Sequence, residues 1–366
     1  AGNMKAMKKS VASGAVLTGI VTVILTLLSM ISMAKVLHLM NTPSDMYGEA
    51  YGYIMVICGG IVAQALYNYL ASVLRALGDS KRPLYFLVVA ALLNIVLDLV
   101  FIIVFRMGAA GAAYATVIAQ GISAVCCLIY IVKRFPILHL ERKDFEICWD
   151  SFGRLLKLGI PMGLQFSITA IGTIIVQSAV NIYGPVHMAG FSAAGKIQNI
   201  FATVFTAFGA TIATYVGQNR GAGKMDRVKQ GVRYTQMMVL GWSVFVMFLM
   251  FFFGKYLTYL FVDPSEQDVV NVSVTYFRTV FWAYPFLGSI FLYRNTLQGM
   301  GYGLVPMLGG VFELVARTGI VVLIAGHTSF AGVCMADPTA WIAALIPLIP
   351  YYFHVMKKYK NKSQVQ

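Results

Sequence analysis

The chain has 366 residues, of which 59% are hydrophobic and only 11% are charged, and its mean hydropathy is +0.75. In soluble domains roughly a quarter of the residues are charged. This composition therefore excludes an ordinary soluble protein and indicates a chain whose solvent is lipid. A formal net charge of +14 would suggest nucleic-acid binding in a soluble chain. Here the positive residues gather in alternate loops, so we attribute the charge to membrane topology and expect no nucleic-acid partner.

Ten apolar stretches follow one another along the chain, and each has the ~20 residues that a helix needs to cross ~30 Å of hydrocarbon. The spans must be helical because an open strand edge would leave backbone groups unpaired in lipid. The sequence therefore predicts an all-α polytopic membrane protein with ten transmembrane helices. The predicted spans are 11–34, 51–74, 84–105, 108–132, 158–183, 188–216, 234–253, 274–293, 305–325 and 331–353.

Basic residues are concentrated on one side of these spans. The intervening loops on the other side hold only Arg106 and Lys255, with Lys35 close to a third, and acids in VDPSEQD at 262–268. By the positive-inside rule, both chain ends are cytoplasmic, which agrees with an even number of spans. We expect a multi-pass protein of a bacterial-type inner (plasma) membrane. The basic loops are 1–9, 75–82, 133–157, 217–233 and 357–362.

The chain also contains an internal repeat. AGNMKAMKKS at 1–10 resembles AGKMDRVKQG at 222–231, and SVLRALGDSKRP at 72–83 resembles NTLQGMGYGLVP at 295–306. The first four spans thus correspond to the last four, and both copies start on the same side, which predicts parallel repeats. Since spans five and six have no counterpart, we expect two further helices upstream of Ala1.

Four segments are expected from this arrangement. Residues 1–135 form an incomplete amino-terminal lobe of four helices, and residues 158–356 form a carboxy-terminal lobe of six. The segment 136–157 combines charged residues with Phe, Ile and Leu, which predicts an interfacial amphipathic helix on the cytoplasmic side. Residues 357–366 are a cytoplasmic tail.

Four stretches of this sequence carry a family likeness: RALGDSKRP, LKLGIPMGLQFSITAIGTIIVQSAVNIYG, GQNRGAGKMDRV and LQGMGYGLVP. Together they resemble the multidrug and toxic compound extrusion (MATE) family of secondary transporters, and the resemblance covers essentially the whole chain. It implies twelve helices in two six-helix lobes around a central cavity that opens alternately to each side. Ten of those helices are present in this sequence.

Ionisable residues inside the apolar spans are the candidates for function, because burying a charge in hydrocarbon costs at least ~2.5 kcal/mol. Asp98 lies in the middle of LLNIVLDLVFIIVF, with Asn94 one helical turn before it and Thr116 in the next span. Their carboxylate, amide and hydroxyl oxygens are hard ligands that suit Na⁺, and the carboxylate alone carries a proton. The alternative is that Asp98 only bonds Asn94 or a neighbouring helix.

The family resemblance matches Asn94, Asp98 and Thr116 to a cation site in the amino-terminal lobe, and it adds a carboxylate on a helix outside this sequence. One branch of the family also has acids on its seventh and tenth helices. The corresponding stretches here, 165–169 and the neighbourhood of Gly288, contain no acid. This departure favours Asp98 over a second cation site in the carboxy-terminal lobe.

Other embedded polar residues lie in the carboxy-terminal half. Glu313 and Arg317 have the i, i+4 spacing of an ion pair, and we expect a structural or gating role in preference to substrate binding. Lys196 and Arg294 are embedded cations that could extend toward an interface. Asp337 precedes a proline and serves either as a cap at a helix break or in a cavity.

Three polar residues fall on the fifth span, Gln165, Gln177 and Asn181, and the last two share a face. They line a cavity or, more commonly in membrane bundles, hydrogen-bond between helices.

Together these features predict an antiporter that exports organic, often cationic, drugs or toxic compounds in exchange for Na⁺ or H⁺. The alternative is a lipid or polysaccharide flippase, but such a protein would line its cavity with several cations. No catalytic or metal spacing occurs, so we expect no enzyme and no cofactor beyond the coupling ion. The expected partners are small organic substrates and the lipid bilayer, and we expect a monomer.

Overall fold

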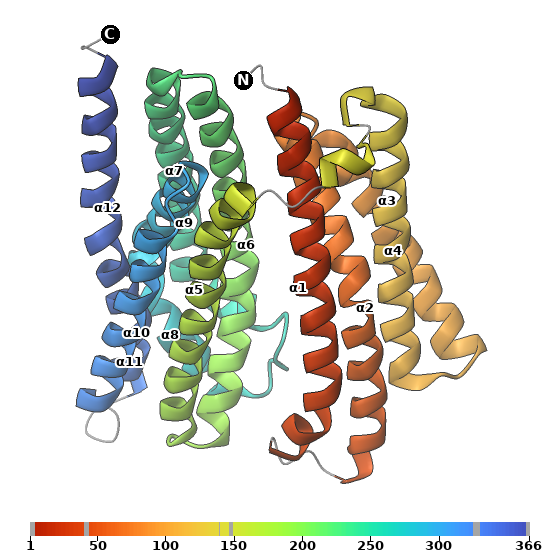
Figure 1. Ribbon diagram of the computed structural model, residues 1–366. Helices are drawn as coiled ribbons and strands as arrows, with labels where there is room; N and C mark the ends of the chain where they lie inside the picture. Colours follow the sequence, from red (N-terminus) through yellow and green to blue (C-terminus); the bar gives the residue numbers. More distant parts are fainter. Residues whose placement is uncertain (1–3, 40–43, 139, 146–148, 325–329, 364–366) are drawn as a thin grey trace. The chain divides into compact units, whose positions relative to one another are not determined.

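The computed structural model describes residues 4–39, 44–138, 140–145, 149–324 and 330–363 (Figure 1). In these residues the regular structure is entirely helical. The chain divides into two compact units, Ala1–Leu155 and Leu156–Gln366. Each unit packs its own helices around its own core, and we describe each separately.

The first unit consists of four long helices and a short π-helix. Its helices α1 and α2 pack together, as do α2 with α4 and α3 with α4. Helices α2 and α4 are in close contact, since a side chain in place of Gly60 would overlap Val117. The elements are α1 (Met4–Leu39), α2 (Ser44–Ala76), α3 (Lys81–Leu99), the π-helix η1 (Val100–Val104) and α4 (Gly108–Arg134).

The segment after α4 does not form the single interfacial helix that we expected over 136–157. It forms two 3₁₀ turns, η2 (Pro136–Leu138) and η3 (Arg142–Phe145), and α5 already begins at Trp149. Pro136 explains the break, because the residue before a proline is driven out of the helical region. Phe135 accordingly has φ −121° and ψ 74°. The remaining residues of this segment, 139 and 146–148, lie outside the described chain.

The second unit is larger and has a more extensive buried core. Its α6 contacts α7, α8 and α9, and its α12 contacts α9 and α10. Buried aromatic side chains such as Phe205, Tyr276 and Trp341 fill the space between them. The elements are α5 (Trp149–Asn181), α6 (Pro185–Gly221), α7 (Met225–Thr258), α8 (Gln267–Val280), the 3₁₀ turn η4 (Phe281–Ala283), α9 (Tyr284–Gly299), α10 (Leu304–Ile324), α11 (Phe330–Cys334) and α12 (Ala336–Ser363).

Nine helical segments of the described chain are long and apolar enough to cross a membrane, and each coincides with a predicted span. The exception among the ten predictions is 274–293, which is divided into α8 and α9 by η4. Pro285 lies in the first turn of α9. Because proline has no amide hydrogen to donate, it starts a new helix there instead of continuing α8.

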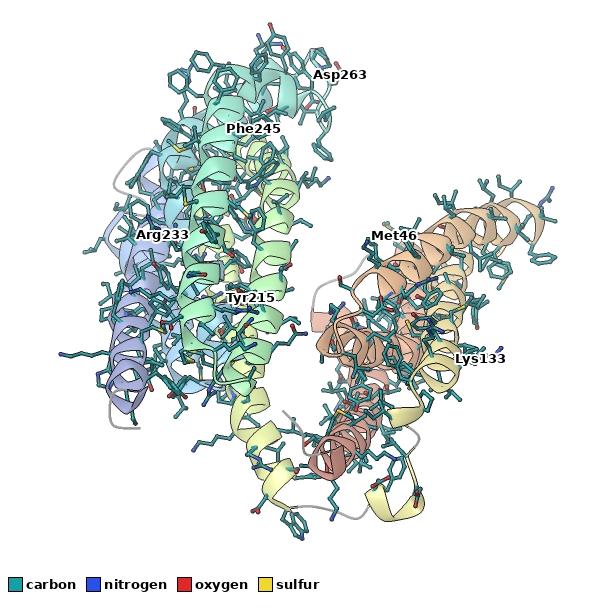
Figure 2. The ribbon with its side chains drawn as sticks, turned by 90° about the horizontal axis from the view of Figure 1, so that it is seen from above. Met46, Lys133, Tyr215, Arg233, Phe245 and Asp263 are labelled. Carbon is teal, nitrogen blue, oxygen red and sulfur yellow. The ribbon has the colours of Figure 1, made fainter. Side chains whose placement is uncertain are left out.

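The outer surfaces of both units are apolar, as expected for proteins in lipid. On α1, Leu27, Leu28 and Ile31 are more than half exposed. On α7, Phe245 and Phe252 also project outward, and Figure 2 shows Phe245 between Arg233 near the start of α7 and Asp263 beyond its end. In water such surfaces would be strongly unfavourable, so they support a membrane environment.

Both units repeat one turn geometry, which supports the duplication. Gly78 after α2 and Gly301 after α9 have φ values of +93° and +79°, in the left-handed region that favours glycine. In each case the next residue donates a hydrogen bond back into the helix: Asp79 N to Leu74 O, 3.0 Å, and Tyr302 N to Leu297 O, 2.9 Å. This is the glycine-terminated helix end of a Schellman motif.

Candidate functional site

The predicted cation site lies in the first unit, where α3 faces α4. Asn94 Nδ2 donates a long hydrogen bond of 3.5 Å to Thr116 Oγ1. The Thr116 hydroxyl donates to the carbonyl oxygen of Ala112 at 3.0 Å. The structure therefore brings two of the three predicted ligands together, and Asp98 follows Asn94 by one turn of α3.

Asp98 has a carboxylate oxygen, Oδ1, that is buried and has no hydrogen-bond partner in the described chain. The side chain as a whole is half-buried. A buried charge without a partner is unfavourable, and a bound cation or proton at this oxygen would compensate it. With the amide oxygen of Asn94 and the hydroxyl of Thr116, the donor set is chemically suited to Na⁺.

The backbone changes directly after Asp98. The α-helix gives way to the π-helix η1, where Phe105 N donates to Val100 O at 3.0 Å. This wider turn packs closely against α4, since a Cβ placed at Gly111 would lie 3.1 Å from Phe101 Cβ. Such π-turns occur often at functional sites. No feature of the sequence indicated this turn.

Two further polar residues of α4 were not predicted as part of the site. Gln120 and Ser123 lie four and seven residues after Thr116, and so on the same face of the helix. Gln120 Oε1 and Ser123 Oγ are buried without a hydrogen-bond partner in the described residues. The helical spacing from Thr116 was the signal that could have identified them. The polar face of α4 is therefore longer than the predicted site.

A second cluster lies in the second unit and consists of four buried charges. The expected ion pair between Glu313 and Arg317 is present, with Glu313 Oε2 3.4 Å from Arg317 Nη1. Arg317 Nε also contacts Asp337 Oδ1 at 3.2 Å, and Arg294 pairs with Glu313. All four residues are at least nine-tenths buried. Two positive and two negative side chains make the cluster electrically neutral.

Neighbouring groups complete this cluster. The Tyr276 hydroxyl donates to Asp337 Oδ2 at 2.8 Å and also contacts Gln198 Oε1. On α5, Gly172 lies against Arg317, since a Cβ there would be 3.2 Å from Arg317 Cδ. The two carboxylates thus have partners from several helices, unlike Asp98.

The cluster shows how Arg294 and Asp337 are bonded. Arg294 does not extend to an interface but is buried and paired with Glu313. Asp337 lies in the first turn of α12 and binds Arg317. The sequence revealed the four charges but not which would meet, because Arg294, Glu313 and Asp337 come from three different helices. Lys196 is exposed, with its ammonium 5.5 Å from the centre of the Phe261 ring.

The three polar residues of α5 separate into two groups. Gln165 is buried and accepts a hydrogen bond of 3.2 Å from Gln298 Nε2 on α9. Gln177 and Asn181 bond to each other, with Gln177 Nε2 3.0 Å from Asn181 Oδ1. Gln165 therefore has the interhelical role that is common in membrane bundles, whereas Asn181 remains exposed on a polar face with Gln177.

The two clusters occupy equivalent positions of the internal repeat. Asn94 follows Pro83, and Arg317 follows Pro306, by the same eleven residues. Thr116 follows Gly111, and Asp337 follows Gly332, by the same five residues, so Thr116 is the counterpart of Asp337. The weak Asn94–Thr116 bond in the first unit thus corresponds to the Arg317–Asp337 ion pair in the second.

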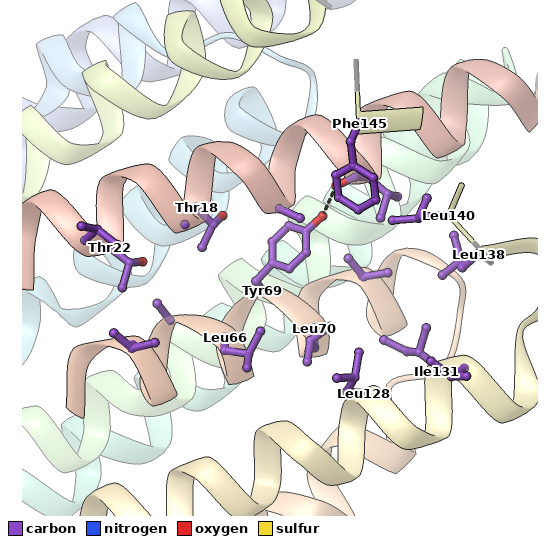
Figure 3. A pocket seen from close by; sticks show the side chains of 18 residues that line it. Thr18, Thr22, Leu66, Tyr69, Leu70, Leu128, Ile131, Leu138, Leu140 and Phe145 are labelled. Carbon is purple, nitrogen blue, oxygen red and sulfur yellow. Dashed lines mark hydrogen bonds between the residues drawn. The ribbon is translucent and has the colours of Figure 1, made fainter. Parts of the chain in front are cut away.

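The first unit also contains an apolar cavity of about 580 Å³, bounded by α1, α2, α4 and the turns after α4 (Figure 3). The Tyr69 hydroxyl crosses it and donates to the carbonyl oxygen of Val11. Its described lining includes the hydroxyls of Thr18 and Thr22 but no charged side chain. The cavity can therefore accept an apolar group but cannot neutralise the charge of an organic cation.

Comparisons with known proteins agree with this architecture. The MatE family model matches residues 1–100 and 161–344, which is more than half of the chain. Among curated relatives, the probable multidrug resistance protein YpnP of Bacillus subtilis is 36% identical over 269 residues, covering 72% of this chain. The match spans 59% of the length of YpnP.

A second relative and a solved structure extend the match over nearly the whole chain. The probable multidrug resistance protein YoeA of B. subtilis is 25% identical over 368 residues, covering 97% of this chain and 79% of YoeA. The outward-facing structure of a multidrug resistance MATE family transporter of the MOP superfamily superposes with a TM-score of 0.88. It is 19% identical and covers 98% of this chain and 86% of the other, so it supports the fold.

Proposed function

Because the chain belongs to the MatE family of membrane transporters, whose members are not enzymes, we propose that it exports organic compounds in exchange for Na⁺ or H⁺. The names of YpnP and YoeA support drugs or other toxic compounds as substrates. Export would proceed by alternating access, with the binding sites exposed to one side of the membrane at a time.

The observation that carries this proposal is Asp98 Oδ1, which is buried and has no hydrogen-bond partner among the residues that the structure describes. It lies beside a pair of neutral ligands, Asn94 and Thr116, that together can coordinate a cation. The carboxylates of the second unit do not offer such a site, because arginines already neutralise Glu313 and Asp337. We therefore assign the coupling of ion binding to transport to Asp98.

The mechanism is competition between ion and substrate. Na⁺ binding, or protonation of Asp98, removes the unpaired charge and stabilises the conformation in which α3 and α4 close around it. If that conformation binds the substrate less tightly, ion entry drives substrate release, and the substrate weakens ion binding by the same factor. The π-turn after Asp98 is where we expect the helix to change shape, because its hydrogen bonds are already irregular.

We assign the neutral cluster of Arg294, Glu313, Arg317 and Asp337 a structural or gating role. It ties α9, α10 and α12 together, and Tyr276 adds α8. A flippase for anionic lipids or polysaccharides would need unpaired cations in its cavity. Here both buried arginines are paired with carboxylates, which supports the antiporter over the flippase.

The basic end of the second unit supports the proposed orientation. In the second unit, Lys229 of α7 and Lys357 of α12 line one cavity, and Arg220 bonds Tyr359 beside it. Asp263 lies beyond the other end of α7, as Figure 2 shows. By the positive-inside rule the basic end faces the cytoplasm of a bacterial-type plasma membrane.

The decisive experiment measures ethidium transport by the full-length protein in vesicles with imposed Na⁺ or pH gradients. Asp98→Asn should abolish gradient-driven transport while membrane insertion is retained, because removing the charge lowers the insertion cost. Thr116→Ala should weaken coupling less, since it removes one neutral ligand. The matched control is Asp150→Asn, an exposed acid at the start of α5.

A binding measurement separates coupling from the choice of substrate. If Na⁺ binds at Asp98, a concentration 100-fold above its Kd should stabilise the protein by about 2.7 kcal/mol, and Asp98→Asn should eliminate this gain. Wild-type transport by Asp98→Asn under both gradients would refute the proposal.

A further inference from the structure

A cavity of about 440 Å³ lies at the basic end of the second unit, between the start of α7 and the end of α12. It is remote in the fold from the charge cluster around Arg317, because it lies at the ends of these helices. Its lining combines polar and apolar side chains: Gly223, Met225, Asp226, Lys229, Tyr352, Phe353, Met356, Lys357 and Tyr359.

The charges of this lining favour a small anion. Lys229 and Lys357 are exposed, and Asp226 is the one acid of the lining, so the side chains carry a net charge of +1. Neither lysine forms an ion pair with Asp226 in the described chain. Two ammonium groups are therefore free to bind a phosphate, and Asp226 can accept a hydrogen bond from a headgroup hydroxyl.

Arg220 fixes one wall of the cavity. Its Nε donates to the Tyr359 hydroxyl at 3.0 Å, and its guanidinium lies over the rings of Tyr302 and Tyr359 at 5.8 and 5.7 Å. These contacts hold the end of α12 against the turn that follows α6. The site therefore includes side chains held by contacts between helices as well as the exposed lysines.

The apolar part of the lining distinguishes a lipid from a soluble anion. Phe353 is 59% exposed, and Met225 and Met356 are partly exposed beside it. A soluble phosphate would gain nothing from these side chains, whereas an acyl chain would bury against them. Basic pockets between membrane helices on the cytoplasmic side are suited to anionic lipid headgroups.

We propose that this cavity binds a phospholipid with a single negative charge in the cytoplasmic leaflet. Its phosphate lies between Lys229 and Lys357, and its acyl chain lies along Phe353 and Met356. The lipid would connect the start of α7 to the end of α12. This inference rests on the proposed orientation and does not depend on the coupling role of Asp98.

The test is native mass spectrometry of the purified full-length protein titrated with phosphatidylglycerol. The double variant K229Q/K357Q should bind this lipid at least roughly tenfold more weakly, because each basic residue contributes to the attraction. The control is K81Q/K133Q, which removes two exposed lysines from the basic end of the first unit. Asp98→Asn should leave lipid binding unchanged, so the two proposals fail independently.

Further titrations identify the ligand. Phosphatidylcholine, which has no net charge, should bind at least roughly tenfold more weakly than phosphatidylglycerol. Phe353→Ala should weaken lipid binding without affecting glycerol 3-phosphate, which lacks acyl chains. Equal binding by K229Q/K357Q and wild type, or full competition by glycerol 3-phosphate, would overturn the proposal.

Discussion

One repeated sequence pattern underlies the α3–α4 pair of the first unit and the α10–α12 pair of the second. The two pairs differ in whether their charged side chains have partners of opposite charge. In the first, Asn94 and Thr116 form a weak neutral hydrogen bond, and Asp98 Oδ1 has no partner in the part of the chain that the structure describes. In the second, the equivalent pair is Arg317 and Asp337, and its charges are compensated. The repeat thus retains a contact between equivalent positions, while the charges are paired in one copy and a carboxylate oxygen has no partner within the described residues in the other.

The two units also differ in how much of their helices they bury. The buried core of the second unit draws on α6, α7, α8, α9 and α12, whereas the buried core of the first unit is formed mainly by α2 and α4. The second unit therefore has the larger core and the paired charges, features that favour rigidity. The first unit has exposed helices, a π-turn and an unpaired carboxylate, features that favour a change of shape.

The largest expected effect comes from breaking the paired cluster. Arg317→Met leaves Asp337 and part of Glu313 uncompensated, and we expect a loss of about 3–5 kcal/mol in the free energy of unfolding. The change is measured by thermal or denaturant unfolding in detergent.

The control for this prediction is the double variant R317M/D337N, in which Arg294 and Glu313 remain as a balanced pair. It should recover most of the loss. Equal destabilisation by the single and double variants would show that packing around Arg317, and not charge compensation, holds the second unit together.

A smaller effect is expected from converting the first site toward the second. In N94R, the introduced guanidinium lies one turn from Asp98 and can neutralise it, as Arg317 neutralises Glu313. We expect Na⁺-dependent stabilisation, about 2.7 kcal/mol at 100 times Kd in the wild type, to disappear. The measurement is the shift in Tm with Na⁺, with K⁺ as the ionic-strength control. Retention of the full shift would mean that the cation binds elsewhere.

The smallest effect concerns the π-turn. Gly111→Ala forces a methyl group to within 3.1 Å of Phe101 Cβ, so we expect a loss of about 1–3 kcal/mol in the free energy of unfolding and altered ion affinity. Gly121→Ala on the same helix is the control, because its nearest neighbour would be Ala63 Cβ at 4.0 Å. If both variants behave alike, the close contact with η1 has no special role.

Some departures from prediction had signals in the sequence and others had none. Pro285 marks the break between α8 and α9, and Pro136 marks the end of α4. Both prolines could have predicted these helix ends from the sequence. The π-turn had no such marker, since VFIIV is an ordinary apolar run. Its geometry depends on the contact between Phe101 and Gly111, which are brought together by the packing of the unit.

The sequence by itself determined the apolar helices and which ionisable residues lie within them, because a lipid solvent imposes span length and apolar composition. It also determined pairs within one helix, such as Glu313 with Arg317, since helical spacing is local. Only the tertiary structure decided that Arg294 meets Glu313, that Asp337 meets Arg317, and that Asp98 Oδ1 meets no partner in the described chain. The physical reason is that hydropathy reports depth in the membrane, whereas a contact between helices also depends on their rotation and packing.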